Sequence, residues 1–227
     1  MVGALLIVAG IAAVDSLNPG TIAPALVLAM SSRPVARVLA FAVGFFVVNV
    51  LGGLLLVFGP GKLLFALIPH LGGHAKHVLE LAGGILLLAG AGVLLALRRR
   101  LIERETNVEP KVKAVAGTGP AFVTGAGLAL AELPTAFPYF AAIAAIDAAD
   151  VSAPEEILLI VVFNAIFLSP LIAIAIGLAL FPSLRESVIE PFRGWMSRHW
   201  PQVLAAILAV AGVVLIAIGI NGLASSA

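Results

Sequence analysis

Two short stretches place a carboxylic acid and a pair of prolines in the middle of an apolar segment. They are Asp15-Ser16-Leu17-Asn18-Pro19-Gly20-Thr21, which is followed by Pro24, and Glu132-Leu133-Pro134-Thr135-Ala136-Phe137-Pro138-Tyr139. Proline lacks an N–H group and its ring clashes with the preceding turn, so both stretches predict a broken helix. Within a membrane, such a break is tolerated only where the backbone is buried in protein or lines a wet cavity. The freed carbonyl and N–H groups predict a binding site at the breaks.

Asp15 and Glu132 are the acids that lie deep in predicted membrane spans. A charged carboxylate at the centre of a spanning helix costs about 2.5–3.5 kcal/mol on insertion scales, and each neighbouring Leu, Ile or Val returns about 0.3–0.6 kcal/mol. Insertion therefore stays favourable, and an acid placed there can take up a proton on one side of the membrane and release it on the other. The alternative is a proline kink whose protonated acid bonds to a neighbouring helix.

Two asparagines, Asn49 and Asn164, lie inside other apolar segments. Asparagine in hydrocarbon normally bonds across a helix interface, for about 0.6–2 kcal/mol. That structural role is one interpretation of the pair. Their related positions in the two halves of the chain, described below, favour including them among the candidate site residues.

Three histidines, His70, His74 and His77, precede Glu80 and would share one face of a helix. Such a face could bind a metal or sense pH. Because no further ligand constrains the group, a solvated loop is the preferred interpretation and no metal site is predicted.

The elements that must position these residues are membrane helices. Of the 227 residues, 62% are hydrophobic and 11% are charged, and the mean hydropathy is +1.17. A spanning helix needs about 20 apolar residues, and the apolar runs are continuous, without the alternation of a barrel strand. Six segments are predicted, roughly 4–30, 36–58, 78–97, 118–146, 155–181 and 202–222. The start of the chain lacks a positive n-region and is interpreted as the first helix.

Several function classes are excluded by the same sequence. The absence of cysteine rules out a disulfide framework, a thiolate metal site and a thiol relay. No basic face exists outside short loops, so nucleic acid is not expected as a partner. Nucleophile-elbow, P-loop and zinc-protease motifs are absent. We therefore expect no enzyme activity, no catalytic residues and no cofactor.

An internal repeat appears at an offset of 115 residues. It aligns Pro19 with Pro134 and Asn49 with Asn164, and Pro24 meets Pro138 after a slip of one residue. Because each half holds three segments, the second half enters the membrane from the opposite side, as in many secondary transporters. The predicted fold is all-α and polytopic, with six transmembrane helices in two inverted three-helix repeats and the first and fourth helices broken at prolines. Its single transmembrane domain, 1–227, comprises repeat one at about 1–97, a polar loop at about 98–116 and repeat two at about 117–222.

The DSLNPGT element, the ELPTAFPY element and the six-helix length resemble the actinobacterial glycolipid-addressing proteins. These are also called the sulfolipid- or peptidoglycolipid-addressing family, within the lysine-exporter superfamily. The resemblance covers nearly the whole chain and implies export of a lipid or glycolipid across the cytoplasmic membrane. The resemblance implies functional importance for six residues, namely Asp15, Asn18, Pro19, Glu132, Pro134 and Pro138. The same superfamily includes thiol-electron carriers, an activity that this cysteine-free chain lacks.

Together these patterns predict a secondary transporter that exports a lipid, glycolipid or lipid-linked intermediate, with protons as the coupling ion. Asp15 and Glu132 would titrate or bind the headgroup, and freed N–H groups around Gly20 and Thr135 would hydrogen-bond it. One alternative is an exporter of a small soluble solute such as an amino acid or a cation. Another is a non-transporting scaffold for envelope-lipid synthesis. Expected partners are membrane lipids, the substrate, and either further copies of the chain or enzymes of envelope-lipid synthesis.

Loop charges predict the topology. The loops after the first, third and fifth segments hold, with their flanks, eleven of the thirteen Lys and Arg residues. By the positive-inside rule these loops are cytoplasmic, and both termini lie outside the inner membrane. Single cysteines at Ser226 and Thr106 test this in a chain without other cysteines. We expect Ser226→Cys to react with an impermeant thiol reagent in intact cells, and labelling of Thr106→Cys from outside would contradict the topology.

Overall fold

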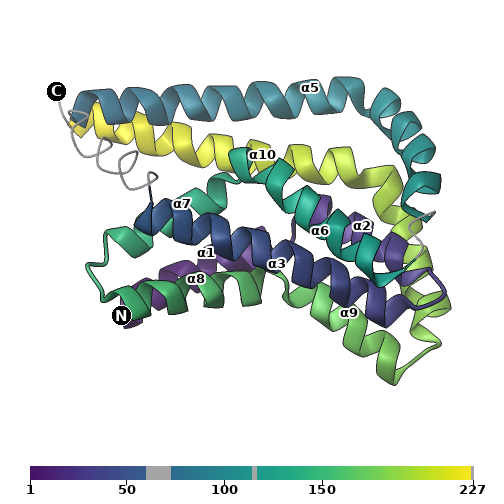
Figure 1. Ribbon diagram of the computed structural model, residues 1–227. Helices are drawn as coiled ribbons and strands as arrows, with labels where there is room; N and C mark the ends of the chain where they lie inside the picture. The colour runs from purple at the N-terminus through teal and green to yellow at the C-terminus, as the bar shows by residue number, and fades with distance from the viewer. Residues whose placement is uncertain (60–72, 114–116, 226–227) are drawn as a thin grey trace. The chain divides into compact units, whose positions relative to one another are not determined.

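The computed structural model describes residues 1–59, 73–113 and 117–225, and the side chains of all of these except 73–76, 79 and 103–113. Every regular element in these ranges is helical (Figure 1). The chain divides into two compact units. Unit 1 comprises Met1–Leu63 and Glu109–Arg193, and unit 2 comprises Leu64–Val108 and Gly194–Ala227.

Most of the helices belong to unit 1, and the two longest contribute to unit 2. In chain order the elements are α1 (Val2–Asp15), α2 (Pro19–Ala29), α3 (Pro34–Phe58), α5 (Gly73–Lys113), α6 (Thr118–Glu132), η2 (Leu133–Thr135), α7 (Phe137–Asp147), α8 (Ala153–Phe167), α9 (Ser169–Leu180), η3 (Arg185–Ile189) and α10 (Glu190–Ser225). Three stretches are long and apolar enough to cross a membrane unaided, namely α3, Glu80–Ile102 and Arg185–Ser225. Three bent pairs of shorter helices raise the number of candidate spans in the described ranges to six.

The bent pairs confirm the helix breaks that the prolines predict. The axes of α1 and α2 differ by 58°, and those of Thr118–Thr135 and α7 differ by 73°. Pro19 is the first residue of α2, where its missing N–H costs nothing and its fixed φ suits the start of a helix. A third break of 52° separates α8 from α9, where Pro170 occupies the first turn of α9.

An unbroken helix, α3, is the centre of unit 1. It packs against α6 at a pair of glycines, because a Cβ on Gly44 would collide with the carbonyl oxygen of Phe122 and a Cβ on Gly125 with that of Phe41. Further along, Gly52 meets the side chain of Leu133. Both helices therefore begin at the same end of unit 1, and small residues bring their backbones into contact.

A contact from the fifth loop lies at this same end. Arg185 donates to the carbonyl oxygen of Ser31, at 3.3 Å, and to that of Met30, where α2 ends. The starts of α3 and α6 and the segment before α10 thus share one side of unit 1, which agrees with the shared side predicted for the odd-numbered loops. The inverted repeat and the orientation of the termini stay predictions.

Within unit 2, α5 and α10 run side by side (Figure 1) with close contacts at glycines. A Cβ on Gly212 would lie 2.8 Å from the carbonyl oxygen of Gly84, and one on Gly219 would lie 2.9 Å from that of His77. One expectation needs correction, because the polar stretch predicted as a loop at 98–116 continues α5 as helix to Lys113. Its Arg, Leu, Glu and Lys residues have high helix propensity, and the polarity of the stretch does not oppose a helix.

The contact between α3 and α6 generates a stability prediction. Gly125→Ala places a methyl group against the Phe41 backbone, which cannot move aside as a flexible side chain would, so we expect a loss of about 1–3 kcal/mol in the free energy of unfolding. Gly127→Ala on the same helix is the matched control, because nothing lies within 4 Å of the added Cβ. Unfolding in detergent measures both variants, and equal stability of the two would contradict the packing.

Candidate functional site

The first break is organised by Asn18, the N-cap of α2. Its Oδ1 accepts a hydrogen bond from the Gly20 N–H at 2.8 Å, and its carbonyl oxygen accepts one from Thr21 Oγ1 at 3.0 Å. Asparagine is a strong N-cap because its side-chain oxygen satisfies an N–H that has no partner in the first turn. Thr21 is completely buried, so its hydroxyl bonds to the backbone at the break and does not reach solvent. Pro24, further along α2, is half-buried.

Glu132, which lies at the second break, contacts residues of the first break. Asn18 Nδ2 donates to Glu132 Oε2 at 3.4 Å. A Cβ on Gly20 would collide with Glu132 Oε1 and lie 3.4 Å from its Cδ. The carboxylate therefore rests against the first turn of α2, at the positive end of the helix dipole. Gly20 is the residue that leaves room for it.

Asp15, the last residue of α1, completes this group. It is half-buried, and its charge acts on that of Glu132. Two carboxylates in a poorly solvated place repel one another, and a proton on either one relieves the repulsion. The four residues Asp15, Asn18, Gly20 and Glu132 are named here the break site.

The remaining residues predicted at the second break lie elsewhere. Pro134, Thr135 and Pro138 are exposed. The Thr135 hydroxyl donates to the carbonyl oxygen of Glu132 at 3.0 Å, which braces the end of α6. Of the second motif, the structure therefore brings Glu132 into the break site and leaves its prolines and threonine outside.

Tyr139 joins the two predicted asparagines in a second, deeper cluster. Its hydroxyl donates to the carbonyl oxygen of Asn49 at 2.6 Å and lies near the side chain of Asn164. Asn164 is completely buried; its Nδ2 donates to Ile160 O at 2.9 Å, and its Oδ1 has no hydrogen-bond partner. Gly53 leaves room for the hydroxyl, because a Cβ there would collide with it.

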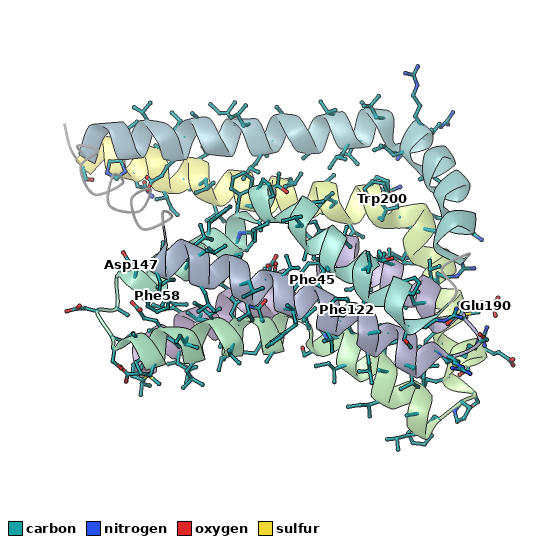
Figure 2. The ribbon with its side chains drawn as sticks, viewed as in Figure 1. Phe45, Phe58, Phe122, Asp147, Glu190 and Trp200 are labelled. Atoms are coloured by element: carbon teal, nitrogen blue, oxygen red, sulfur yellow. The ribbon has the colours of Figure 1, made fainter. Side chains whose placement is uncertain are left out.

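Sequence reasoning left Tyr139 out of the candidate residues. Two signals could have found it: it ends the ELPTAFPY element, and it is the single tyrosine of the chain. A buried tyrosine usually finds a partner for its hydroxyl, and the polar residues available inside neighbouring spans were the two asparagines. The ring also packs on Phe163, with centroids 4.9 Å apart. Phe163 in turn packs on Phe167, which packs on Phe45, the residue labelled in Figure 2.

The histidine group is described only in part. His70 and the side chain of His74 lie outside the described residues. His77 Nδ1 pairs with Glu80 Oε2 at 2.8 Å in unit 2. Among the residues whose side chains are described, no group of three metal-ligating side chains comes together.

The Tyr139 cluster generates a stability prediction. Tyr139→Phe keeps the ring and removes the hydroxyl, so we expect a loss of about 1 kcal/mol in the free energy of unfolding. Thr124→Val is the matched control, because it removes a hydroxyl that donates within its own helix, to Pro120 O. Thermal unfolding in detergent compares the two, and a smaller loss for Tyr139→Phe than for Thr124→Val would contradict the assignment.

Comparison with known proteins supports the lipid-related interpretation of these motifs. The family model of Sap, the sulfolipid-1-addressing protein, matches residues 8–221. No curated protein and no solved structure matches the chain. The match contains both breaks and the Tyr139 cluster, whereas membership of the wider lysine-exporter superfamily stays a prediction. The chain is thus a helical membrane protein that belongs to the sulfolipid-1-addressing protein family.

Proposed function

We propose that this protein is a secondary transporter that exports a lipid with an anionic or sugar headgroup across the cytoplasmic membrane, driven by protons. The observation that carries the proposal is the contact of Glu132 with Asn18 and Gly20. It joins two helix breaks that are far apart in the sequence. A membrane protein has little structural reason to place an acid at such a junction, because an ionisable group in a span is expensive.

The chemistry follows from where the carboxylate rests. An ionised Glu132 is attracted to the positive end of α2 and accepts from Asn18. The headgroup binds at this ionised carboxylate: its hydroxyl groups donate to Glu132, beside the Asn18 amide and the positive end of the α2 dipole. A proton that arrives from outside competes with the headgroup for Glu132 and releases it, and loss of that proton to the cytoplasm restores the carboxylate, so proton entry drives export. The charges of Asp15 and Glu132 repel one another, so the two acids act as one group.

A lipid is favoured over a soluble solute by the surroundings of the break site. Leu17, between Asp15 and Asn18, is 63% exposed, and Phe137, just after the second break, is 67% exposed. In a membrane protein such apolar side chains face acyl chains. A headgroup at the break site could therefore remain attached to chains in the bilayer. The family's sulfolipid name points to cargo of the same class.

Reconstituted transport tests the proposal. Proteoliposomes with an imposed pH gradient would report movement of a fluorescent, anionic-headgroup lipid between leaflets by quenching from outside. We expect Asp15→Asn and Glu132→Gln each to abolish the dependence on the gradient. Gly20→Ala should lower the rate about tenfold, because its Cβ displaces the Glu132 carboxylate while every polar group is kept. Gly10→Ala is the control, because nothing lies within 4 Å of its added Cβ.

Each alternative has its own outcome in this assay. Full gradient-driven movement by the double variant Asp15→Asn, Glu132→Gln would make both acids structural. No lipid movement by the unaltered protein, with gradient-driven efflux of an enclosed amino acid, would favour a solute exporter. Neither activity, in protein of normal stability, would favour a scaffold.

A further inference from the structure

Two arginines hold one turn of unit 1, the Ser31–Ser32 turn that follows α2. Arg37 Nη2 donates to Ser32 Oγ at 3.4 Å from the first turns of α3. Arg185 reaches the turn from η3 and donates to Ser31 O at 3.3 Å and to Met30 O. Guanidinium groups from two distant segments therefore meet at the same three-residue stretch, Met30–Ser32.

Two donors of this group have no acceptor. Ser31 Oγ and Arg37 Nε are buried atoms without a hydrogen-bond partner in the described part of unit 1. A buried donor that stays unpaired costs about 1–3 kcal/mol, and more when it is charged. Native structures keep few such groups, and each calls for an explanation. A ligand that brings oxygen atoms would supply what both donors lack.

The charge of the group is also uncompensated. Among the described side chains, no carboxylate forms an ion pair with Arg37 or Arg185. Glu186 adjoins Arg185 in the sequence but is exposed and forms no ion pair. Arg33, one residue before α3, adds a third, exposed guanidinium to the same end. A cationic site with free hydrogen-bond donors favours an anion.

We propose that the Ser31–Ser32 turn, with Arg37 and Arg185, binds the oxyanion of a lipid headgroup, a phosphate or a sulfate. Arginine matches such groups because its planar fork donates two parallel hydrogen bonds. Basic pockets between membrane helices on the cytoplasmic side are suited to anionic headgroups. This site is separate from the break site and lies at the other end of α2.

The site extends the proposed function by giving the headgroup a first contact. In the structure, Arg185 is occupied with the carbonyl groups at the C-terminal end of α2, a favourable place for a cation. An oxyanion competes for the same guanidinium. Its binding loosens this end of α2, whose other end holds Asn18 and Gly20.

Binding, not transport, tests the inference, so a failure of export would leave its outcome unaffected. The purified protein in detergent is titrated with phosphatidylglycerol or phosphatidylcholine, and bound lipid is counted by native mass spectrometry. A second arm titrates inorganic phosphate without anionic lipid and follows thermal unfolding. We expect phosphatidylglycerol to bind, and Arg37→Gln and Arg185→Gln each to weaken it about tenfold or more. Arg198→Gln, an exposed arginine of α10, should leave the affinity unchanged.

The two arms separate the sources of the oxyanion. Loss of phosphatidylglycerol binding in both variants supports the site with a lipid as ligand. Stabilisation by phosphate alone, lost in the same variants, supports it with a free anion as ligand. Equal binding of both lipids without a phosphate effect, or unchanged affinity in Arg37→Gln, would overturn it. Arg37→Gln carries the test if Arg185→Gln does not fold, because Arg37 does not hold the end of α2.

Discussion

The backbone of a helix that stops inside a membrane must find its hydrogen-bond partners within the protein, because hydrocarbon offers none. At the first break one residue meets most of this demand. Asn18 takes the Gly20 N–H on its side-chain oxygen and the Ile22 N–H and Thr21 hydroxyl on its carbonyl oxygen. Its Nδ2 then remains to donate to Glu132. The position of the acid therefore depends on how the broken backbone is satisfied.

An unbroken helix supports both sides of the second break. The adjacent glycines Gly52 and Gly53 of α3 receive Leu133 and the Tyr139 hydroxyl, which lie before and after the bend. Without side chains of their own, these glycines allow the broken segment to approach the α3 backbone. Tyr139 adds a hydrogen bond to Asn49 O, so the bend is fixed by packing on one side and by a polar contact on the other.

Most of the helices and their breaks could be predicted from the prolines and from the lengths of the apolar runs. Pro19 and Pro134 each marked a bend, because a proline acts on the backbone within one turn of itself. The helical state of 98–113 was missed, since polarity says where a segment can lie and not whether it is helical. The close approach of α3 to α6 was not predicted, because glycines are common in membrane helices and do not indicate which helix they pack against.

The site could be predicted as a set of residues but not as a geometry. Acids beside prolines identified Asp15 and Glu132 through the cost of an ionisable group in a span. Which motif residues turn inward depends on the direction of each half-helix after its break, and a 73° bend changes that direction without leaving a pattern in the sequence. Pro138 and Thr135 therefore matched the motif and still face outward.

The helix α2 links the two groups of charges in unit 1. A carboxylate lies at its N-terminal end and a guanidinium at its C-terminal end, the arrangement that a helix dipole favours. Its 11 residues span about 16 Å at 1.5 Å per residue, about half of a hydrocarbon core of about 30 Å. If Arg185 lies at the membrane surface, Asn18 and Glu132 lie near the midplane. An anionic headgroup that leaves the arginines would then need to travel only the length of α2 to meet the second positive end, which makes this half-helix the natural path between them.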